Sequence, residues 1–195
     1  MDTRMPVNSR YDVVVAGARC AGAATALLLA RKGLRVLVVD RGRYGTDMLS
    51  THALMRGAVV QLHRWGVLGA IEAAGTPVVR STSFHYAERE VRIPLKARDG
   101  IQGLYAPRRI LLDRLLVDAA MAAGAQVLYG LRVAQLVRRA DGRVVGAALE
   151  DGDGEMSFVS ADTVVGADGL HSTVARLAGA EPYRVGRHSC AVVFG

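Results

Sequence analysis

The segment YDVVVAGARCAG, from Tyr11 to Gly22, joins a run of valines to a turn with a glycine at each end. A continuous valine-rich run is typical of a strand that is covered on both faces of a parallel sheet. Residues 20–32, rich in Ala and Leu, predict a helix that Gly33 closes. Residues 35–39, RVLVV, predict a second buried strand. The three segments therefore form a β-α-β unit with a right-handed connection.

The turn between the first strand and the helix has the spacing of a phosphate-binding loop. Gly17 permits a tight bend, Gly22 lets helix and strand pack closely, and the helix amides and dipole favour phosphate. Asp40 ends the second strand, where an acidic side chain accepts hydrogen bonds from ribose hydroxyls. We therefore predict a dinucleotide site at Gly17, Ala18, Arg19, Ala21, Gly22 and Asp40. This turn alone does not choose between NAD and FAD.

Arg19 occupies the position where such loops usually carry a second glycine. A Cβ atom there should crowd the closest approach of the phosphate. Two interpretations follow. Either the turn relaxes and the guanidinium reaches the pyrophosphate, or the side chain points to solvent and only the backbone contributes.

Composition excludes several other classes of protein. The 25 basic and 18 acidic residues give a net charge of +7, but the basic residues are scattered and form no stripe with aromatic residues, which argues against nucleic-acid binding. Cys20 and Cys190 form neither a CxxC pair nor a metal-ligand spacing, as expected in a reducing compartment. The apolar stretch 13–30 contains Arg19 and two glycines, so we expect no membrane span and a cytoplasmic protein.

The rest of the chain predicts alternating helices and strands. We expect helices at 53–65, with a shorter one through Glu72, and at 108–123 and 170–177; strand pairs within 79–93; a loop at 94–103; and strands at 126–129, 131–137, 144–149, 156–159 and 163–165, with a further strand opening at 190–195.

A second glycine-rich turn, GADGLHS at residues 166–172, follows the strand predicted at 163–165. It resembles the DG motif of the flavoprotein monooxygenases related to p-hydroxybenzoate hydroxylase, and of the geranylgeranyl reductases and flavin-dependent halogenases. The resemblance implies that Asp168 helps to hold FAD. The family's motif usually ends in Arg seven residues after the Asp, whereas this chain has Ala175 and then Arg176, which puts in doubt a contact between Arg176 and NADPH.

The segment RILLD at residues 109–113, with Leu116 following, resembles the RxxLDxxL helix start of the same family. In that family the Arg contacts the phosphate and ribose region of FAD, which implies this role for Arg109. An Arg at a helix start opposes the helix dipole and needs an anion to compensate it. The alternative is an amphipathic helix with a surface Arg.

The resemblance extends from Tyr11 onward and implies further contacts with FAD at Arg41 and Val133. It implies an α/β fold: a Rossmann-like FAD-binding domain with a parallel sheet, a β-meander crossover and the beginning of a β-rich substrate domain. It also implies NAD(P)H as electron donor and an aromatic or other small organic substrate that is hydroxylated with O₂. We expect a flexible leader at 1–10, the FAD-binding domain at 11–78 and 104–180, and parts of an incomplete substrate domain at 79–103 and 181–195.

Members of this family are usually longer, so we expect the chain to lack a later strand with its GD motif and most of the sheet over the substrate. An inner strand would then become an edge, and FAD would be weakly held or absent, with little turnover. A reductase of the geranylgeranyl type and a non-catalytic nucleotide-binding fragment remain alternatives. No catalytic residue is assigned, because His52, His171 and His188 have no recognisable partner and Cys20 is expected to be buried.

Overall fold

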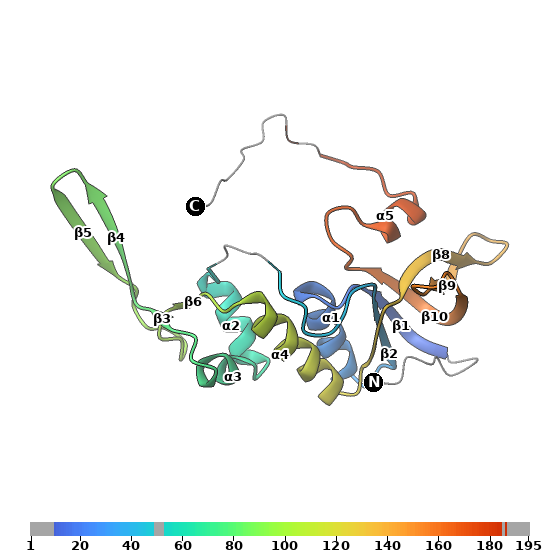
Figure 1. Cartoon of the computed structure of the whole chain (residues 1–195), viewed down its shortest axis with the longest axis horizontal. Coiled ribbons are helices and arrows are strands. Elements are labelled where there is room, and N and C mark those ends of the chain that lie inside the picture. Colours follow the sequence, from blue (N-terminus) through green and yellow to red (C-terminus); the bar gives the residue numbers. More distant parts are fainter. Residues whose placement is uncertain (1–9, 49–52, 185, 187–195) are drawn as a thin grey trace.

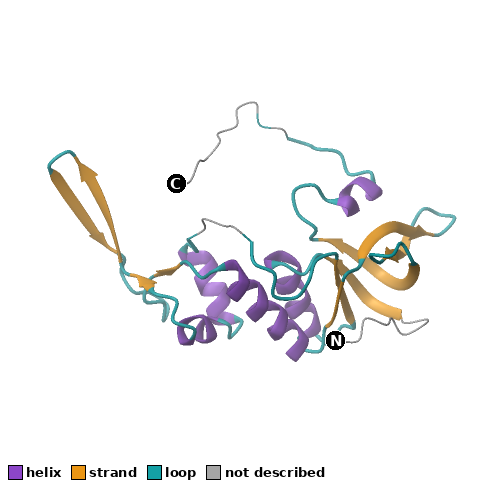
Figure 2. Ribbon diagram, in the orientation of Figure 1, coloured by secondary structure: helices purple, strands orange, loops and turns teal. Residues whose placement is uncertain are grey.

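The computed structural model describes residues 10–48, 53–184 and 186. Its largest sheet has six strands in the order β7-β2-β1-β10-β9-β8 (Figures 1 and 2). The strands are β1 (Arg10–Ala16), β2 (Val36–Asp40), β7 (Gln126–Tyr129), β8 (Arg132–Arg138), β9 (Val144–Glu150) and β10 (Met156–Gly166). Strands β7, β2, β1 and β10 run parallel, whereas β8, β9 and the first half of β10 form an antiparallel meander. The predicted parallel sheet and meander are confirmed, and both belong to the same sheet.

Strand β10 corrects the prediction of two separate strands at 156–159 and 163–165. It is one strand of eleven residues. The polar residues Ser160 and Asp162 do not interrupt it, because Ser160 is in register with Arg10 of β1 and Asp162 lies exposed, where Arg10 binds it at 2.8 Å. After Ser160, β10 pairs with β1 alone within the described part of the chain.

The helices are α1 (Cys20–Ala30), α2 (Arg56–Arg64), α3 (Leu68–Ala73), α4 (Arg109–Ala122) and α5 (Thr173–Ala178). Side chains of β1 alternate between two cores, as the two-residue period of a strand requires. Val15 packs in one core with Leu27 of α1 and Leu116 of α4, whereas Val14 packs in the other with Val174 of α5. Both faces of the parallel strands are therefore buried. None of the helices in the described ranges has the length and apolarity to cross a membrane.

Two helices begin later than predicted, each for a local reason. Helix α2 starts at Arg56 because the amide of Leu54 donates to the carbonyl of Tyr105 at 2.7 Å and holds the preceding chain extended. Helix α5 starts at Thr173 because Gly169 has φ +89° and Ser172 provides the N-terminal cap.

A hairpin extends away from the rest of the protein in the segment predicted to begin the substrate domain (Figure 1). It consists of β4 (Ser81–Tyr86) and β5 (Arg89–Pro94), and its apolar side chains Phe84 and Tyr86 are 44% and 64% exposed. At its base, β3 (Val78–Val79) pairs with β6 (Leu104–Tyr105), a strand that the sequence did not predict. The division into two domains remains a prediction. The leader and the strand expected at 190–195 lie outside the described residues, except for Arg10, which begins β1.

Candidate dinucleotide-binding site

The turn after β1 needs glycine at both ends because backbone approaches it closely. Gly17 has φ +101°, and a Cβ atom there would lie 2.4 Å from the carbonyl oxygen of Ala167. A Cβ atom on Gly22 would lie 1.8 Å from the carbonyl oxygen of Gly17. Contacts this short do not occur between real atoms. The glycines therefore let α1 begin directly above the end of β1.

The two glycine-rich turns predicted from sequence lie against each other. Strand β10 is the parallel neighbour of β1, so both turns leave the same edge of the sheet. The amide of Ala167 donates to the carbonyl of Ala16 at 2.8 Å, and Gly17 meets Ala167 in the contact described above. Motifs that are about 150 residues apart in sequence thus form one structural unit.

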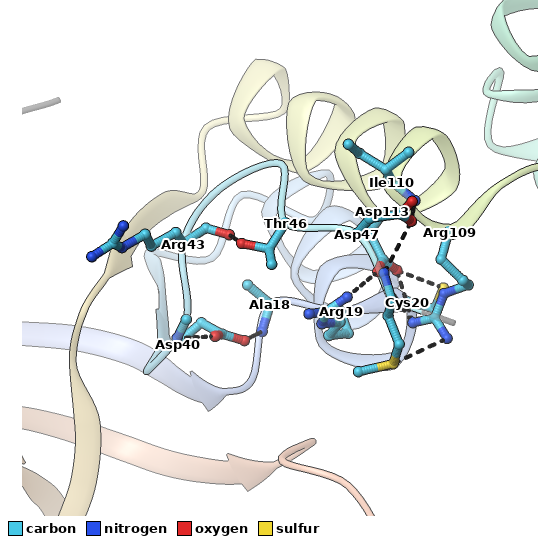
Figure 3. A network of polar contacts seen from close by, with 12 residues as sticks. Ala18, Arg19, Cys20, Asp40, Arg43, Thr46, Asp47, Arg109, Ile110 and Asp113 are labelled. Carbon is cyan, nitrogen blue, oxygen red and sulfur yellow. Dashed lines mark hydrogen bonds and ion pairs between the residues drawn. The ribbon is translucent and has the colours of Figure 1, made fainter. Parts of the chain in front are cut away.

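Asp40 ties the end of β2 to the first turn. Its carboxylate accepts hydrogen bonds from the amides of Ala18 and Gly42, each at 2.7 Å (Figure 3). The carboxylate is therefore fixed beside the start of α1, where the sequence predicts the ribose. Arg41, the next residue, is exposed.

A pocket opens between this carboxylate, the loop after β2 and α4. Its lining consists of Ala18, Arg19, Asp40, Arg43, Tyr44, Gly45, Thr46, Asp113, Arg114 and Tyr129. Only the first three were predicted as site residues. Val133, the predicted adenine contact, is 4% exposed and packs within the second core, so its side chain does not line the pocket.

Aromatic residues form one wall of the pocket. Tyr44 and Tyr129 meet edge to face with ring centroids 6.0 Å apart, and the hydroxyl of Tyr44 donates to Asp118 at 2.6 Å. Burial and the nearby negative charge of Asp40 raise the pKa of Tyr129 to about 12. Burial also raises the pKa of Tyr44, so both rings are neutral, and the guanidinium of Arg114 lies over the Tyr44 ring with Cζ 5.4 Å from its centroid.

The loop that carries Tyr44 is attached to α4 by Asp47. The carboxylate of Asp47 accepts a hydrogen bond from the amide of Ile110 at 3.2 Å (Figure 3). It also forms an ion pair with Arg108. This acid supplies a cap that α4 lacks at its own N-terminus. The hydrogen bond from Arg108 is the main reason that the pKa of Asp47 is lowered.

Arg19 fits its position without strain. Its backbone is extended, with φ −84° and ψ −173°, so the turn does not need a second glycine there. Its Nη1 binds Oδ2 of Asp113 on α4 at 2.9 Å, and the side chain is 33% exposed. The guanidinium is thus neither free in solvent nor held by the turn itself. Whether it also reaches a pyrophosphate stays a prediction.

Asp113 binds three side chains at the junction of α1 and α4 (Figure 3). It accepts hydrogen bonds from Arg19, from the thiol of Cys20 at 3.0 Å and from Nη2 of Arg109 at 3.1 and 3.2 Å. With 8% of its surface exposed, it is the buried charged residue of the described chain. The sequence analysis did not select it. Its spacing of four residues from Arg109 was the available signal.

Cys20 is an unreactive thiol in this environment. Burial, followed by the hydrogen bond and negative charge of Asp113, raises its pKa to about 12. A position at a helix N-terminus would by itself lower the thiol pKa, so burial and Asp113 prevail. The arrangement does not favour covalent attachment of a cofactor to this sulfur.

Arg109 binds both oxygens of Asp113 but keeps one buried nitrogen without a partner in the described part of the chain. Its compensating anion is Asp113, one turn further along α4, so the charge that the sequence argument required is partly supplied by the protein. The other terminal nitrogen, Nη1, lies 3.9 Å from Sδ of Met48, and Nε is buried without a hydrogen-bond partner in the described part of the chain. Arg109 can therefore still accept an anion.

Asp168 caps α5. Its carboxylate accepts hydrogen bonds from Ser172 Oγ at 2.5 Å and from the amides of Thr173 and Val174 at 2.7 and 3.1 Å. Burial acts to raise its pKa, but the hydrogen bond from Ser172 and the backbone bonds outweigh it, so the pKa lies below the usual aspartate value. His171, in the same turn, is exposed. His52 and His188 lie outside the described residues. No group of residues suited to a metal ion occurs in the described ranges.

A strand-turn-helix site with an acid at the end of the next strand, packed against a second glycine-rich turn, defines a dinucleotide-binding α/β domain. Residues 10–193 match the family described as FAD binding domain, and the chain belongs to that family. It is 33% identical over 178 residues to Protein FixC of Escherichia coli O157:H7, and the matched region covers 87% of this chain and 39% of FixC. It is 31% identical over 174 residues to menaquinone reductase of Mycolicibacterium smegmatis, covering 89% of this chain and 41% of that protein.

Among solved structures, the chain is similar to the flavin-dependent monooxygenase PieE, determined in complex with FAD and substrate. The TM-score is 0.71 at 28% identity, covering 89% of this chain and 33% of PieE. The chain spans about two fifths of the length of these curated relatives.

The residues present fit FAD. The close glycine contacts leave the backbone of the turn without side chains at its two ends, and α1 has no side-chain cap at its N-terminus. The guanidinium of Arg109 lies on the same side of α4 as the turn, because its Nη2 and Arg19 bind the same carboxylate, and its Nε has no partner in the described residues. Both features suit a pyrophosphate.

Proposed function

We propose that the chain forms the FAD-binding part of an NAD(P)H-dependent flavoprotein oxidoreductase, and that the enzyme hydroxylates a small organic substrate with O₂. The observation that carries this proposal is the open start of α1 between the fixed carboxylate of Asp40 and the incompletely satisfied guanidinium of Arg109. Membership of the FAD-binding family and similarity to PieE support it. Cysteine usage supports a cytoplasmic location.

In this proposal each residue of the site binds or orients one part of FAD. The amides of the turn from Gly17 to Gly22 and the guanidinium of Arg109 bind the pyrophosphate, and Asp40 accepts hydrogen bonds from the ribose. Arg41, the backbone at Val133 and the segment held by Asp168 complete the contacts that the family resemblance implies. FAD, when bound, supplies the redox chemistry, and the protein supplies binding, orientation and shielding.

A second candidate is a flavoprotein reductase, the alternative to hydroxylation that the DG motif also allows. The identity of 31% to menaquinone reductase favours it. The two candidates differ in the fate of O₂. A monooxygenase consumes O₂ in proportion to product, whereas a reductase turns over its organic acceptor without O₂. A nucleotide-binding fragment without turnover would bind FAD and show neither behaviour.

The test is a titration of the chain with FAD, in which quenching of flavin fluorescence measures binding. We expect weak but saturable binding, because the later strand with its GD motif is expected to be missing. Asp40→Ala should weaken this binding about a further tenfold, which corresponds to the loss of roughly 1.4 kcal/mol. Asp12→Ala is the matched control, because Asp12 is also a carboxylate on the sheet but pairs with Arg35 away from the pocket. Circular dichroism verifies that both variants fold.

Addition of NADPH or NADH to the FAD-loaded chain without O₂ then shows whether the flavin absorbance bleaches. Readmission of O₂ separates the candidates. Absence of binding of both FAD and ADP, or equal affinity of the Asp40→Ala variant and the wild type for FAD, would contradict the proposal.

A further inference from the structure

Arg19 changes the charge balance at the start of α1. If position 19 carried a glycine, Asp113 would face Arg109 alone, and this pair would have no net charge. With Arg19 present, two guanidinium groups share one buried carboxylate, so the cluster carries a net charge of +1. Cys20 does not alter this balance, because its raised pKa keeps the thiol neutral.

The two arginines share Asp113 unequally. Arg19 makes the shortest ion pair, at 2.9 Å, whereas Arg109 approaches the two carboxylate oxygens at 3.1 and 3.2 Å. Arg109 also has the poorer remaining contacts, with a sulfur atom near Nη1 and no partner for Nε in the described residues. A buried donor without an acceptor carries a free-energy cost that an incoming anion removes.

We propose that Arg19 is a positioning residue that occupies Asp113 and thereby leaves the Arg109 guanidinium available to the pyrophosphate of FAD. This inference rests on the proposed function and deepens it. Arg19, at the start of α1, then serves as the counter-ion of Asp113 on α4. Arg109 can then turn from the carboxylate to a phosphate without leaving a buried negative charge unpaired, which would be strongly unfavourable.

This role explains why a long side chain is accepted in the phosphate-binding turn. The extended backbone at Arg19 directs its side chain to α4 rather than across the open amides of α1 (Figure 3). The side chain therefore contributes positive charge while it leaves the backbone of the turn accessible.

The test measures binding of ADP, which carries the adenosine and diphosphate of FAD, with adenosine as the probe that lacks phosphate. We expect Arg19→Gln to weaken ADP binding about tenfold, because Asp113 then holds Arg109. Adenosine binding should not change. Arg19→Lys should stay close to the wild type, since lysine retains the ion pair with Asp113. Arg35→Gln removes the same charge from another ion pair on the protein surface and serves as the control.

Two double variants identify the route of the effect. Adding Asp113→Asn to Arg19→Gln should restore most of the ADP affinity, because no carboxylate remains to retain Arg109. In an Arg109→Gln background, Arg19→Gln should cause no further loss. Additive losses from Arg19→Gln and Arg109→Gln would overturn the proposal and indicate direct contact of Arg19 with phosphate.

Equal losses in Arg19→Gln and Arg19→Lys would also overturn it, as would unchanged affinity in Arg19→Gln. These results leave the proposed function intact, because the wild type still binds ADP and FAD. A wild-type chain that binds neither nucleotide would overturn both. Thermal unfolding of each variant shows whether a loss of affinity reflects a loss of fold, and the Lys variant supplies the comparison if the Gln variant is unstable.

Discussion

The two helices that begin at the glycine-rich turns differ in whether side chains cap their N-termini. Helix α5 follows β10 and is capped by Ser172 and by the carboxylate of Asp168. Helix α1 follows the neighbouring strand β1 and has no side-chain cap at Arg19. Amides at a helix start attract negative charge in both cases. The protein supplies that charge to α5 from its own side chains, whereas the start of α1 stays open to a ligand.

The largest effect on this comparison is expected at Gly22, the glycine that ends the turn before α1. Gly22→Ala places a Cβ atom 1.8 Å from the carbonyl oxygen of Gly17, so the backbone of α1 must move away from β1. We expect the free energy of unfolding to fall by about 3 kcal/mol or more, as for other overpacked sites. Urea unfolding followed by circular dichroism measures the change.

Gly57→Ala is the matched control, because Gly57 also lies in a helix but has open space around its Cβ position. Alanine there should stabilise the protein by up to about 1 kcal/mol. If the two variants were equally stable, close packing of the turn would not explain the glycine at position 22.

Individual residues show which parts of the fold and of the site could be predicted from the sequence alone. Local patterns identified the strand-turn-helix unit, Asp40 and the GADG turn, because each depends on residues that are close in the chain. The sequence analysis did not predict that β1 and β10 are neighbours, which the structure shows as a parallel pair. Tyr44 and Tyr129 were missed because their role depends on partners 74 and 85 residues away, which no local period records. Asp113 has a local signal in its spacing of four residues from Arg109, but its contact with Arg19 joins residues that are 94 apart. The continuity of β10 was missed because Ser160 and Asp162 look like a turn until β1 lies beside them.

A smaller effect is expected at the capped helix. Asp168→Ala removes the acceptor for two amides of α5 and for Ser172 Oγ. Loss of a cap of this kind costs about 1–2 kcal/mol of stability. Asp162→Ala is the control, because Asp162 forms an exposed surface pair with Arg10, and such pairs contribute little. Urea unfolding that gives the same stability for both variants would show that the cap does not stabilise α5.

The smallest effect is expected when the carboxylate of Asp168, which caps α5, is titrated. The pKa of Asp168 is lowered in the folded protein, so its ionised carboxylate stabilises the fold at pH values above the usual aspartate pKa. This contribution is lost as the pH falls through the lowered, folded-state pKa. The stability difference between the wild type and Asp168→Asn should therefore be constant near pH 6–7, at under about 1 kcal/mol, and should shrink below about pH 4. Urea unfolding at a series of pH values measures it. Ser172→Ala removes the hydrogen bond that lowers this pKa most and should move the loss to higher pH. A difference that grows on acidification would mean that hydrogen bonds to the ionised form of Asp168 do not hold the start of α5.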